Sequence, residues 1–471
     1  MSDSEDFDVI VIGAGAVGEN VADRVVKAGL SAALIEAELV GGECSYWACM
    51  PSKALLRPGT ALKAASTVAG SREAVTGTLD AQQVLNRRNQ FTSNWDDSSQ
   101  AEWVKDSGIT LVRGTARLTG ERAVEVTHDD VVTAMSARVA VVLATGSTPT
   151  IPPVNGLDAV DFWGTREATS APQIPQSLAV LGGGVAGAEL AQAFSRLGAK
   201  VTIIARSGLL SNFPQPAAQL VQNGLEGDGV EVLTDTATES VRQAADGTVT
   251  ISLAGGRAVT AEKLLVSTGR RPALANLGLE DLDLDPKKLV IDASGRVRGA
   301  DWLYAVGDAA GKVLLTHQGK YEARMTGSAI AARAAGTLGE TVEDWSAYAA
   351  SANEYAVPQV VFTDPEIAMA GRTVKQAQEA GIIVSETSLD IAVAGSALHS
   401  DGYQGWAQMV VDEDRKVLIG ATFAGPDVAE LLHAATIAIA GEVPLERLWH
   451  AVPAYPTISE VWLRLLEKYG L

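Results

Sequence analysis

The stretch Asp8-Val9-Ile10-Val11-Ile12-Gly13-Ala14-Gly15-Ala16-Val17-Gly18 decides the fold of this chain. Its first five residues form an apolar, β-branched run that is typical of a buried strand. A helical stretch from Glu19 to Ala28 and a second apolar run, Ala32 to Ile35, complete a βαβ unit. Because Gly13, Gly15 and Gly18 carry no Cβ, backbone amides and the helix dipole can approach a pyrophosphate there.

Glu36 follows the second apolar run and stands 18 residues past Gly18. A carboxylate at this place can accept hydrogen bonds from the hydroxyl groups of an adenosine ribose. The glycine pattern alone would be a weak signal, because a plain tight turn can use the same residues. Together with Glu36 it predicts a dinucleotide site near the N-terminus.

The same arrangement occurs a second time, beginning with the apolar run Leu178 to Leu181. It continues with Gly182, Gly184 and Gly187, a helical stretch from Ala188 to Leu197, and a strand from Lys200 to Ile204. Each of the two units is trailed by a further strand that ends in a glycine turn, at Val139 to Leu143 and at Lys263 to Val266. The repetition predicts two similar nucleotide-binding domains.

The second unit ends its strand with Ala205 and Arg206, where the first unit has an acid. Arg206 can face the 2′-phosphate of a ribose, so this position favours NADP(H) over NAD(H). The alternative is that Arg206 is a solvated loop cation, which is common on any protein surface.

From Val357 onward the pattern changes to strands at Met409 to Asp412 and Val417 to Phe423. A long apolar helix, Val428 to Ala440, and a terminal helix after Thr457 follow. The predicted fold class is α/β, with two doubly wound, Rossmann-like nucleotide-binding domains plus a C-terminal α+β domain. Proline-rich segments and Arg271-Pro272 mark the expected crossings between the two nucleotide-binding domains. The expected division is 1–150 and 271–345 for the first nucleotide-binding domain, 151–270 for the second, and 346–471 for a C-terminal dimerisation domain.

The net charge of the chain argues against two classes of partner, nucleic acids and anionic membranes. The chain has 471 residues and a net charge of −20, from 37 Lys plus Arg against 57 Asp plus Glu. This charge should repel nucleic acid and anionic membrane surfaces, so neither is expected as a partner. The segment Met1 to Phe7 is acidic and has no targeting pattern, which predicts a cytoplasmic location. No metal site is predicted.

The two cysteines of the chain lie in Gly41-Gly42-Glu43-Cys44-Ser45-Tyr46-Trp47-Ala48-Cys49-Met50-Pro51-Ser52-Lys53. A lone close pair in a large chain suggests catalysis, although two buried cysteines can also act as small hydrophobes. Residues five apart do not stack on an ideal helix, so a disulfide here requires an irregular turn around Cys44. A helix N-terminus and Lys53 would stabilise a thiolate.

This segment resembles the active-site signature of the pyridine nucleotide:disulfide oxidoreductases, the family of glutathione reductase, dihydrolipoyl dehydrogenase and mercuric reductase. The resemblance spans nearly the whole chain. Further pieces lie in family order: Ala144-Thr145-Gly146, the second glycine pattern with Glu189, Ser267-Thr268-Gly269-Arg270, Tyr304-Ala305-Val306-Gly307-Asp308 and Phe362-Thr363-Asp364-Pro365-Glu366.

The resemblance implies a role for each matching position. Cys49 would be the thiol in charge-transfer contact with the flavin, Cys44 the interchange thiol that attacks the acceptor, and Lys53 the partner of Glu189 beside the isoalloxazine. The residues implied for FAD are Gly13, Gly15, Gly18, Glu36, Gly42, Lys53, Ala116, Thr145, Gly146 and Asp308. Those implied for the nicotinamide nucleotide are Gly182, Gly184, Gly187, Arg206 and Gly269.

One position departs from the pattern of the disulfide-reducing members. They use a His near the C-terminus as acid and base for the partner subunit's interchange thiol, whereas here Tyr455 stands at that place and Glu460 remains to orient it. A phenol is a poor base near neutral pH because its pKa is about 10. His450, five residues upstream, is the alternative base. Glu43, where relatives commonly have Thr, would disfavour a thiolate at Cys44 unless it points away.

The sequence and the resemblance together predict a homodimeric FAD enzyme that takes electrons from NAD(P)H, with NADPH favoured. The electrons pass to the Cys44–Cys49 disulfide and on to a small-molecule acceptor, which can be a quinone or a disulfide. Three alternatives remain: a dihydrolipoyl dehydrogenase of a multienzyme complex using NAD, a mercuric-reductase-like enzyme, and a redox-sensing flavoprotein subunit. The mercuric reductases share the Tyr and the Ala-Arg pair but carry an additional C-terminal cysteine pair, and this chain ends Glu467 to Leu471 without one.

Overall fold

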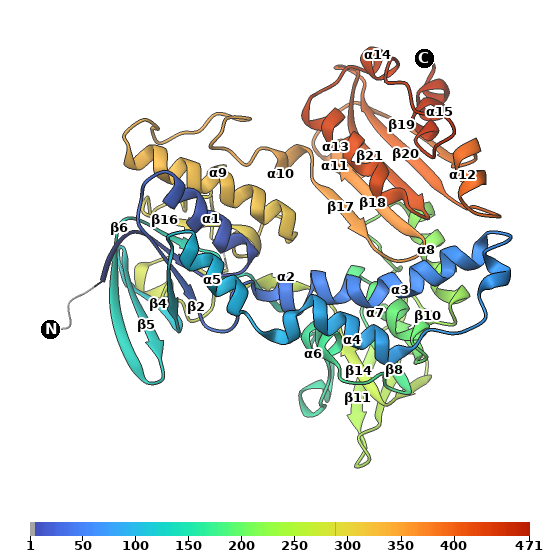
Figure 1. Cartoon of the computed structure of the whole chain (residues 1–471), viewed down its shortest axis with the longest axis horizontal. Coiled ribbons are helices and arrows are strands. Elements are labelled where there is room, and N and C mark those ends of the chain that lie inside the picture. Colours follow the sequence, from blue (N-terminus) through green and yellow to red (C-terminus); the bar gives the residue numbers. More distant parts are fainter. Residues whose placement is uncertain (1–4, 288) are drawn as a thin grey trace. The chain divides into compact units, whose positions relative to one another are not determined.

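The computed structural model describes residues 5–287 and 289–471, so the first four residues of the acidic N-terminal segment lie outside it. The chain forms two compact units, each assembled from three separate segments. Unit 1 comprises Met1–Met50, Asn89–Thr150 and Arg270–Asn353, and unit 2 comprises Pro51–Arg88, Ile151–Gly269 and Glu354–Leu471. Figure 1 traces the segments by colour.

Unit 1 is built on a seven-stranded sheet with the order β3-β2-β1-β6-β5-β4 and with β16 paired to β6. The strands are β1 (Glu5–Ile12), β2 (Ala32–Glu36), β3 (Thr110–Arg113), β4 (Thr115–Gly120), β5 (Ala123–His128), β6 (Val131–Leu143) and β16 (Leu303–Ala305). β1, β2, β3, β16 and the second half of β6 pair in parallel. β6 begins earlier than the predicted Val139 because its first half pairs antiparallel with β5.

Two helices of unit 1 pack against each other, α1 (Ala16–Lys27) and α9 (Thr316–Ala334) (Figure 1). A Cβ at Gly319 would lie 2.6 Å from Val17 Cγ2, and one at Gly327 would lie 2.8 Å from Arg24 Cβ. Glycines therefore let the two helices approach closely. α1 begins at Ala16 rather than at the predicted Glu19, because Gly15 already serves as its N-cap in extended conformation.

The cysteine segment runs through the helices α2 and α3, and α5 contacts α2 through the side chain of Gln100. α2 covers Gly42–Tyr46, α3 covers Cys49–Thr67 and α5 covers Ser98–Asp106. α3 begins in unit 1 and continues into unit 2, where α4 (Ala81–Phe91) follows.

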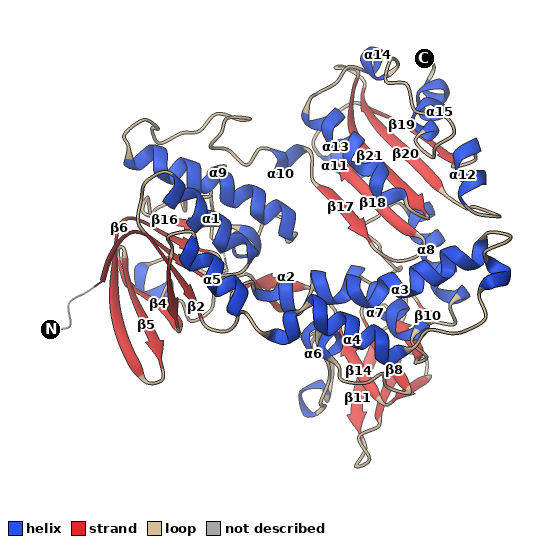
Figure 2. Ribbon diagram, in the orientation of Figure 1, coloured by secondary structure: helices blue, strands red, loops and turns tan. Residues whose placement is uncertain are grey.

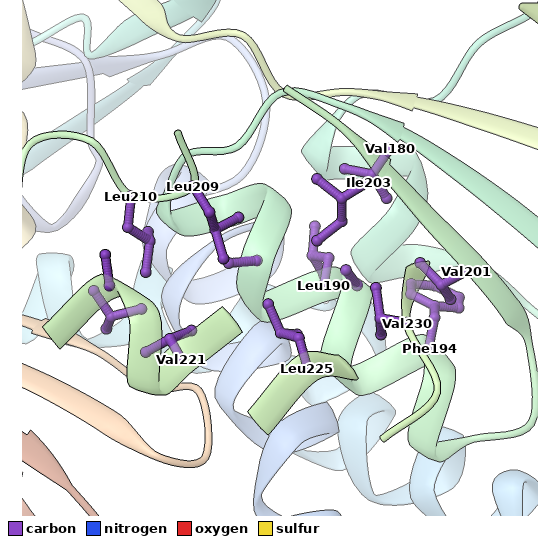
Figure 3. Close-up of a cluster of buried hydrophobic side chains, with 14 of the residues drawn as sticks. Val180, Leu190, Phe194, Val201, Ile203, Leu209, Leu210, Val221, Leu225 and Val230 are labelled. Carbon is purple, nitrogen blue, oxygen red and sulfur yellow. The ribbon is translucent and has the colours of Figure 1, made fainter. Parts of the chain in front are cut away.

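Unit 2 contains the second nucleotide-binding fold, a parallel sheet with the order β10-β9-β8-β14. Its elements are β8 (Ser177–Leu181), α7 (Val185–Arg196), β9 (Lys200–Ile204), α8 (Gln215–Gly227), β10 (Glu231–Leu233) and β14 (Lys263–Val266). An antiparallel sheet of β11 (Thr238–Gln243), β12 (Val249–Leu253) and β13 (Ala258–Ala261) follows β10. Figure 3 shows Val180 and Ile203 of this sheet facing Leu190 and Phe194 of α7.

The C-terminal part of unit 2 is an antiparallel sheet with the order β17-β18-β21-β20-β19 (Figure 2). Its elements are β17 (Pro358–Val361), β18 (Glu366–Gly371), β19 (Val384–Asp390), β20 (Trp406–Asp412), β21 (Val417–Gly425), α13 (Leu432–Ala440) and α15 (Glu460–Tyr469). The single helix predicted over Val428 to Ala440 is wrong in its first turn. Val428–Leu431 is a 3₁₀ turn, entered from Asp427 in left-handed conformation, and its Ala429 N–H donates to the Glu366 carboxylate.

A mixed sheet with parallel strands in unit 1, a parallel sheet in unit 2 and a C-terminal α+β domain confirm the predicted fold class. Among the described residues, no helix is both long and apolar enough to cross a membrane.

Phe194 gives a test of the core of unit 2. Its ring is buried and lies 6.0 Å from that of Trp163, centroid to centroid. Phe194→Ala should lower the free energy of unfolding by about 3–5 kcal/mol, because the lost packing leaves a cavity. Denaturant unfolding followed by circular dichroism measures this change. The same substitution at Phe91, which is 45% exposed, is the control, and an equal loss at both positions would contradict the expected role of Phe194.

Candidate active site

A cavity of about 330 Å³ in unit 1 contains most of the positions predicted to hold FAD. It is lined by the turn between β1 and α1, the end of β2, α2, the turn after β6 and the start of α9. The predicted residues on its wall are Gly13, Gly15, Glu36, Gly42, Ala116, Thr145, Gly146 and Asp308. Cys44 and Thr316 line it as well, so the cavity joins the glycine turn after β1 to one of the two cysteines.

The floor of this cavity is made of backbone atoms in close contact. A Cβ at Gly13 would lie 2.4 Å from the Ala144 carbonyl oxygen, and one at Gly42 would lie 2.9 Å from Gly15 Cα. Gly18 lies behind this floor, where a Cβ would meet the Gly13 carbonyl oxygen at 1.9 Å. Glycine is therefore required at these positions, and the bare backbone amides beside the α1 N-terminus suit a pyrophosphate.

Glu36 stands at the end of β2 on the wall of the cavity. Its Oε2 accepts from Ala14 N–H and its Oε1 accepts from Glu38 N–H, both at 2.8 Å. Burial raises the pKa of this carboxyl, and the two backbone hydrogen bonds oppose that rise. The carboxylate is thus held in place by backbone donors and retains lone pairs for the hydroxyl groups of a ribose.

Asp308 belongs to a network of hydrogen bonds with Ser147 and Arg270, of which the sequence had indicated Asp308 and Arg270 but not Ser147. Ser147 Oγ donates to Asp308 Oδ2 at 2.5 Å, and Arg270 donates both to that hydroxyl and to the Ser147 carbonyl oxygen at 2.7 Å. Arg270 Nη2 also lies 3.9 Å from Glu43 Oε1. This guanidinium offsets the negative charge that Glu43 brings next to Cys44. Arg270 lies in a recognised motif, whereas Ser147 gave no signal beyond following Gly146.

Glu322 of α9 fixes the turn that carries Asp308. Its Oε2 accepts from Gly307 N–H at 2.5 Å, and its Oε1 accepts from the side chain of Asn353. Burial raises the pKa of Glu322 to about 7, and these two hydrogen bonds oppose the shift. Sequence reasoning missed this residue, because an acid within a small-residue helix carries no motif.

The two cysteines lie on different helices, Cys44 within α2 and Cys49 as the first residue of α3. The chain leaves helical conformation between them at Trp47, where φ is −135°. This break supplies the irregular turn that the five-residue spacing requires. Cys49 Sγ lies 3.3 Å from Thr316 Oγ1 on α9.

The two sulfurs are electrostatically coupled. The hydrogen bond with Cys49 is the largest cause that raises the pKa of Cys44, and burial raises it further. Thr316 and Lys320 act in the opposite direction. A charge on one sulfur therefore disfavours a charge on the other, so the pair is set up to hold one negative charge.

In unit 2 the predicted pair of Lys53 and Glu189 is present, with 2.7 Å between Nζ and Oε2. Glu189 is buried on α7, and its Oε1 accepts from Phe362 N–H at 3.0 Å. The Lys53 ammonium also lies 4.8 Å from the centroid of the Phe362 ring. Phe362 thus contacts both Lys53 and Glu189, and the sequence did not predict these contacts.

The second glycine pattern forms the turn between β8 and α7. A Cβ at Gly182 would lie 2.5 Å from the Ser267 carbonyl oxygen, and one at Gly187 would lie 2.4 Å from the Gly182 carbonyl oxygen. Gly184 is the N-cap of α7, and Gly269 has a left-handed φ of 119° after β14. Arg206 is exposed just past the end of β9. All of these lie at the carboxyl edge of the parallel sheet, where nucleotides bind in such folds.

Tyr455 and Glu460 lie near the start of α15. Tyr455 is 78% exposed. Glu460 is buried, and its Oε1 is paired with Arg464 at 2.5 Å. Its Oε2 is also buried and has no hydrogen-bond partner among the described residues. His450 is exposed as well and lies in the preceding loop. The apolar side chains of Ile437, Trp449 and Val452 are likewise exposed.

Two dinucleotide-binding folds, a dithiol beside the first of them and a separate C-terminal domain define a class of two-nucleotide redox enzymes. The chain matches the model of the pyridine nucleotide-disulphide oxidoreductases over residues 7–335 and the dimerisation domain of the same family over residues 357–465. It belongs to the pyridine nucleotide-disulphide oxidoreductase family.

Similar proteins include the mercuric reductase of Shigella flexneri, 31% identical over 463 residues that cover 96% of this chain and 79% of that protein. The dihydrolipoyl dehydrogenase of Thermus scotoductus is 32% identical, with 98% of this chain and 97% of that protein covered. The structure of a Cu(II) complex of the HOCl-induced flavoprotein disulfide reductase RclA from Escherichia coli aligns with a TM-score of 0.83 at 22% identity, covering 98% of this chain and 99% of that one.

Family membership confirms several predictions. The chain is an FAD-dependent oxidoreductase that uses NAD(P)H, and its dimerisation domain supports a homodimer. Within the family, FAD supplies the flavin chemistry that links the nicotinamide to the dithiol. The cavity of unit 1 fits this cofactor, because its bare amides suit the pyrophosphate and its two carboxylates, Glu36 and Asp308, can accept from hydroxyl groups.

Glu322 makes the stability of unit 1 depend on pH. Because the pKa of Glu322 is about 7 in the folded chain and about 4.5 when unfolded, the folded state binds the extra proton between these values. Stability from this group is fully present below pH ~4.5, falls as pH rises, and is lost above pH ~7, by about 3 kcal/mol in all. Glu322→Gln should flatten this part of the curve, as measured by urea unfolding from pH 5 to 8. An unchanged slope would contradict the assignment.

Proposed function

We propose that this enzyme passes two electrons from NADPH through FAD to the Cys44–Cys49 disulfide and from there to a small-molecule acceptor. The observation that carries the proposal is the meeting of Cys44 and Thr316 with the nucleotide-binding turn in one cavity. Cys49 lies against the same Thr316 hydroxyl. NADPH and the disulfide give NADP⁺, one thiol and one thiolate, and the acceptor then takes the two electrons while the S–S bond re-forms.

The residues around the dithiol have distinct parts in this reaction. Thr316 Oγ1 can donate a hydrogen bond to Cys49 Sγ and so favours negative charge on that sulfur. Arg270 balances Glu43 next to Cys44. Lys53 follows Cys49 by one turn of α3, and Glu189 and Phe362 fix its ammonium group. These contacts hold the charges in place before the reaction, which reduces the reorganisation that it requires.

The preference for NADPH rests on Arg206. It stands past the end of β9 where an acid would select NAD, and its side chain is exposed to a ligand. A guanidinium recognises a phosphate with paired hydrogen bonds, whereas Ala205 offers none of the carboxylate contacts that a free 2′-hydroxyl would use.

Arg206→Glu tests this preference. The variant should lose about 10- to 100-fold in kcat/KM for NADPH and change little for NADH, because only the 2′-phosphate interacts with the guanidinium. Steady-state kinetics with both nucleotides measure the ratio. Arg242→Glu, an equal charge change at an exposed position of β11, should leave the ratio unchanged. A parallel fall for NADH and NADPH would count against a 2′-phosphate site at Arg206.

We infer the chemical class of the electron acceptor from the presence of Tyr455 where disulfide-reducing relatives have a His. An exposed phenol cannot remove a proton from a thiol efficiently near neutral pH, so an acceptor that needs no such base is favoured. A quinone meets this condition. Mercuric ion is a second candidate, because a mercuric reductase is 31% identical to this chain. The sequence also resembles the mercuric reductases as a group at Tyr455 and at Ala205-Arg206. A dihydrolipoyl dehydrogenase activity is opposed by the same two positions.

NADPH oxidation with menadione, mercuric ion, lipoamide and glutathione disulfide separates these candidates. Turnover with menadione or mercuric ion should exceed that with the two disulfides. Tyr455→His should raise any disulfide turnover by at least about tenfold, because an imidazole near its pKa can serve as the base. Tyr355→His, at another exposed tyrosine, is the control. Rapid lipoamide or glutathione turnover by the unaltered enzyme would refute the proposed acceptor class.

A further inference from the structure

A glutamine of α5 contacts the short helix that carries Cys44, and no motif marks its position. The Tyr46 hydroxyl donates a hydrogen bond to Gln100 Oε1, and Gln100 Nε2 donates to Ser45 Oγ at 3.2 Å. A Cβ at Gly41 would lie 2.3 Å from the same Nε2. Gly41 is the N-cap of α2 and Tyr46 is its last residue, so one side chain touches the helix at both ends.

Two side chains just before α5 hold the same helix. Trp95 Nε1 donates to the Tyr46 carbonyl oxygen at 3.2 Å. Asp97, the N-cap of α5, accepts through Oδ2 from the N–H of Val40, two residues before α2, at 2.7 Å. Tyr46 is buried, so its ring is also enclosed by protein. These contacts leave α2 few positions within unit 1, and we call the three side chains that make them the α5 clamp: Trp95, Asp97 and Gln100.

The second cysteine is held by a different element. Cys49 begins α3, and its Sγ lies 3.3 Å from Oγ1 of Thr316, the first residue of α9. Thr316 and Cys44 line the same cavity. The chain leaves helical conformation at Trp47, so the two sulfurs lie on separate helices. The α5 clamp on α2 and the contact of Cys49 with α9 therefore determine how close the sulfurs stay to each other.

We propose that Gln100 is a positioning residue that holds Cys44 where the Cys44–Cys49 disulfide can close. The inference rests on the proposed function, in which this disulfide opens and re-forms in each turnover. On closure the two thiols give up two protons and two electrons to the acceptor, and one S–S bond forms. Closure restricts α2, so it costs less conformational entropy when the α5 clamp has already restricted that helix in the dithiol state. Without Gln100 the equilibrium shifts toward the open dithiol.

The equilibrium between dithiol and disulfide tests this inference without turnover. The chain has two cysteines, so only one disulfide can form within it. The holoenzyme is equilibrated anaerobically with mixtures of reduced and oxidised dithiothreitol, free thiols are blocked with N-ethylmaleimide, and mass spectrometry gives the fraction of disulfide. Gln100→Met keeps the length of the side chain but removes both of its hydrogen bonds to α2. It should lower the equilibrium constant for closure by roughly three- to tenfold, and a tenfold fall corresponds to a potential about 30 mV less negative.

A second variant probes the same contact from the side of α2. Tyr46→Phe removes the hydroxyl that donates to Gln100 and should shift the equilibrium in the same direction, which keeps the test open if Gln100→Met does not fold. The double variant should shift the equilibrium no further than the larger of the two single shifts, because both changes remove one shared interaction.

Val104→Ala is the matched control on α5. Val104 is fully buried in the core of unit 1 and lies outside the α5 clamp. This variant should lower the midpoint of thermal unfolding and leave the equilibrium constant for closure unchanged. An unchanged or larger constant in Gln100→Met or Tyr46→Phe, additive shifts in the double variant, or an equal shift in Val104→Ala would overturn the inference. If the unaltered enzyme forms no Cys44–Cys49 disulfide in any mixture, the proposed function itself is refuted.

Discussion

Contact between backbone and backbone is the constraint on which the first nucleotide-binding fold depends. Beneath the cavity of unit 1, the peptide groups at Gly13, Gly18 and Gly42 approach neighbouring strands and turns so closely that no side chain fits. This closeness leaves amide groups bare at the start of α1, and it also brings α2 with Cys44 to the same cavity wall. The position of the redox cysteine thus follows from the packing that makes the dinucleotide site.

Charge is the second constraint, because a chain of net charge −20 must receive a cofactor that carries a pyrophosphate. At the cavity, a positively charged side chain lies among the acidic ones. Arg270 is shared between Ser147, which donates to Asp308, and Glu43, whose carboxylate stands beside Cys44. One guanidinium therefore orders Asp308, which we propose faces the flavin, and lies 3.9 Å from Glu43, an acid that departs from the family pattern. Arg270 thus places a positive charge beside Glu43.

Sequence alone predicted the features that repeat or that carry a motif. Both glycine patterns and the strand and helix that flank each one could be named, because spacing and chemistry act there over short stretches. The pair of Lys53 with Glu189 spans 136 residues and could be named only through the family resemblance. Residues that act across long stretches could not. Glu322 holds a turn 15 residues away and lies in no motif. Phe362 lies in a recognised motif, but its contact with Glu189 across 173 residues could not be read from that motif. The five-residue spacing of the cysteines predicted an irregular turn, but the sequence could not place the break at Trp47.

The interleaving of the two units has a consequence for how the chain is made. β16, the strand at Leu303–Ala305, pairs with β6, whose residues precede it by about 160 positions. Synthesis proceeds at roughly 5–20 residues per second, so β6 waits on the order of 10–30 seconds for its partner to leave the ribosome. During that interval the apolar C-terminal end of β6 lacks one of its neighbouring strands. Residues 151–269, which form the nucleotide-binding fold of unit 2, leave the ribosome in the same interval. The N-terminal fold is thus the first to begin and among the last to be finished.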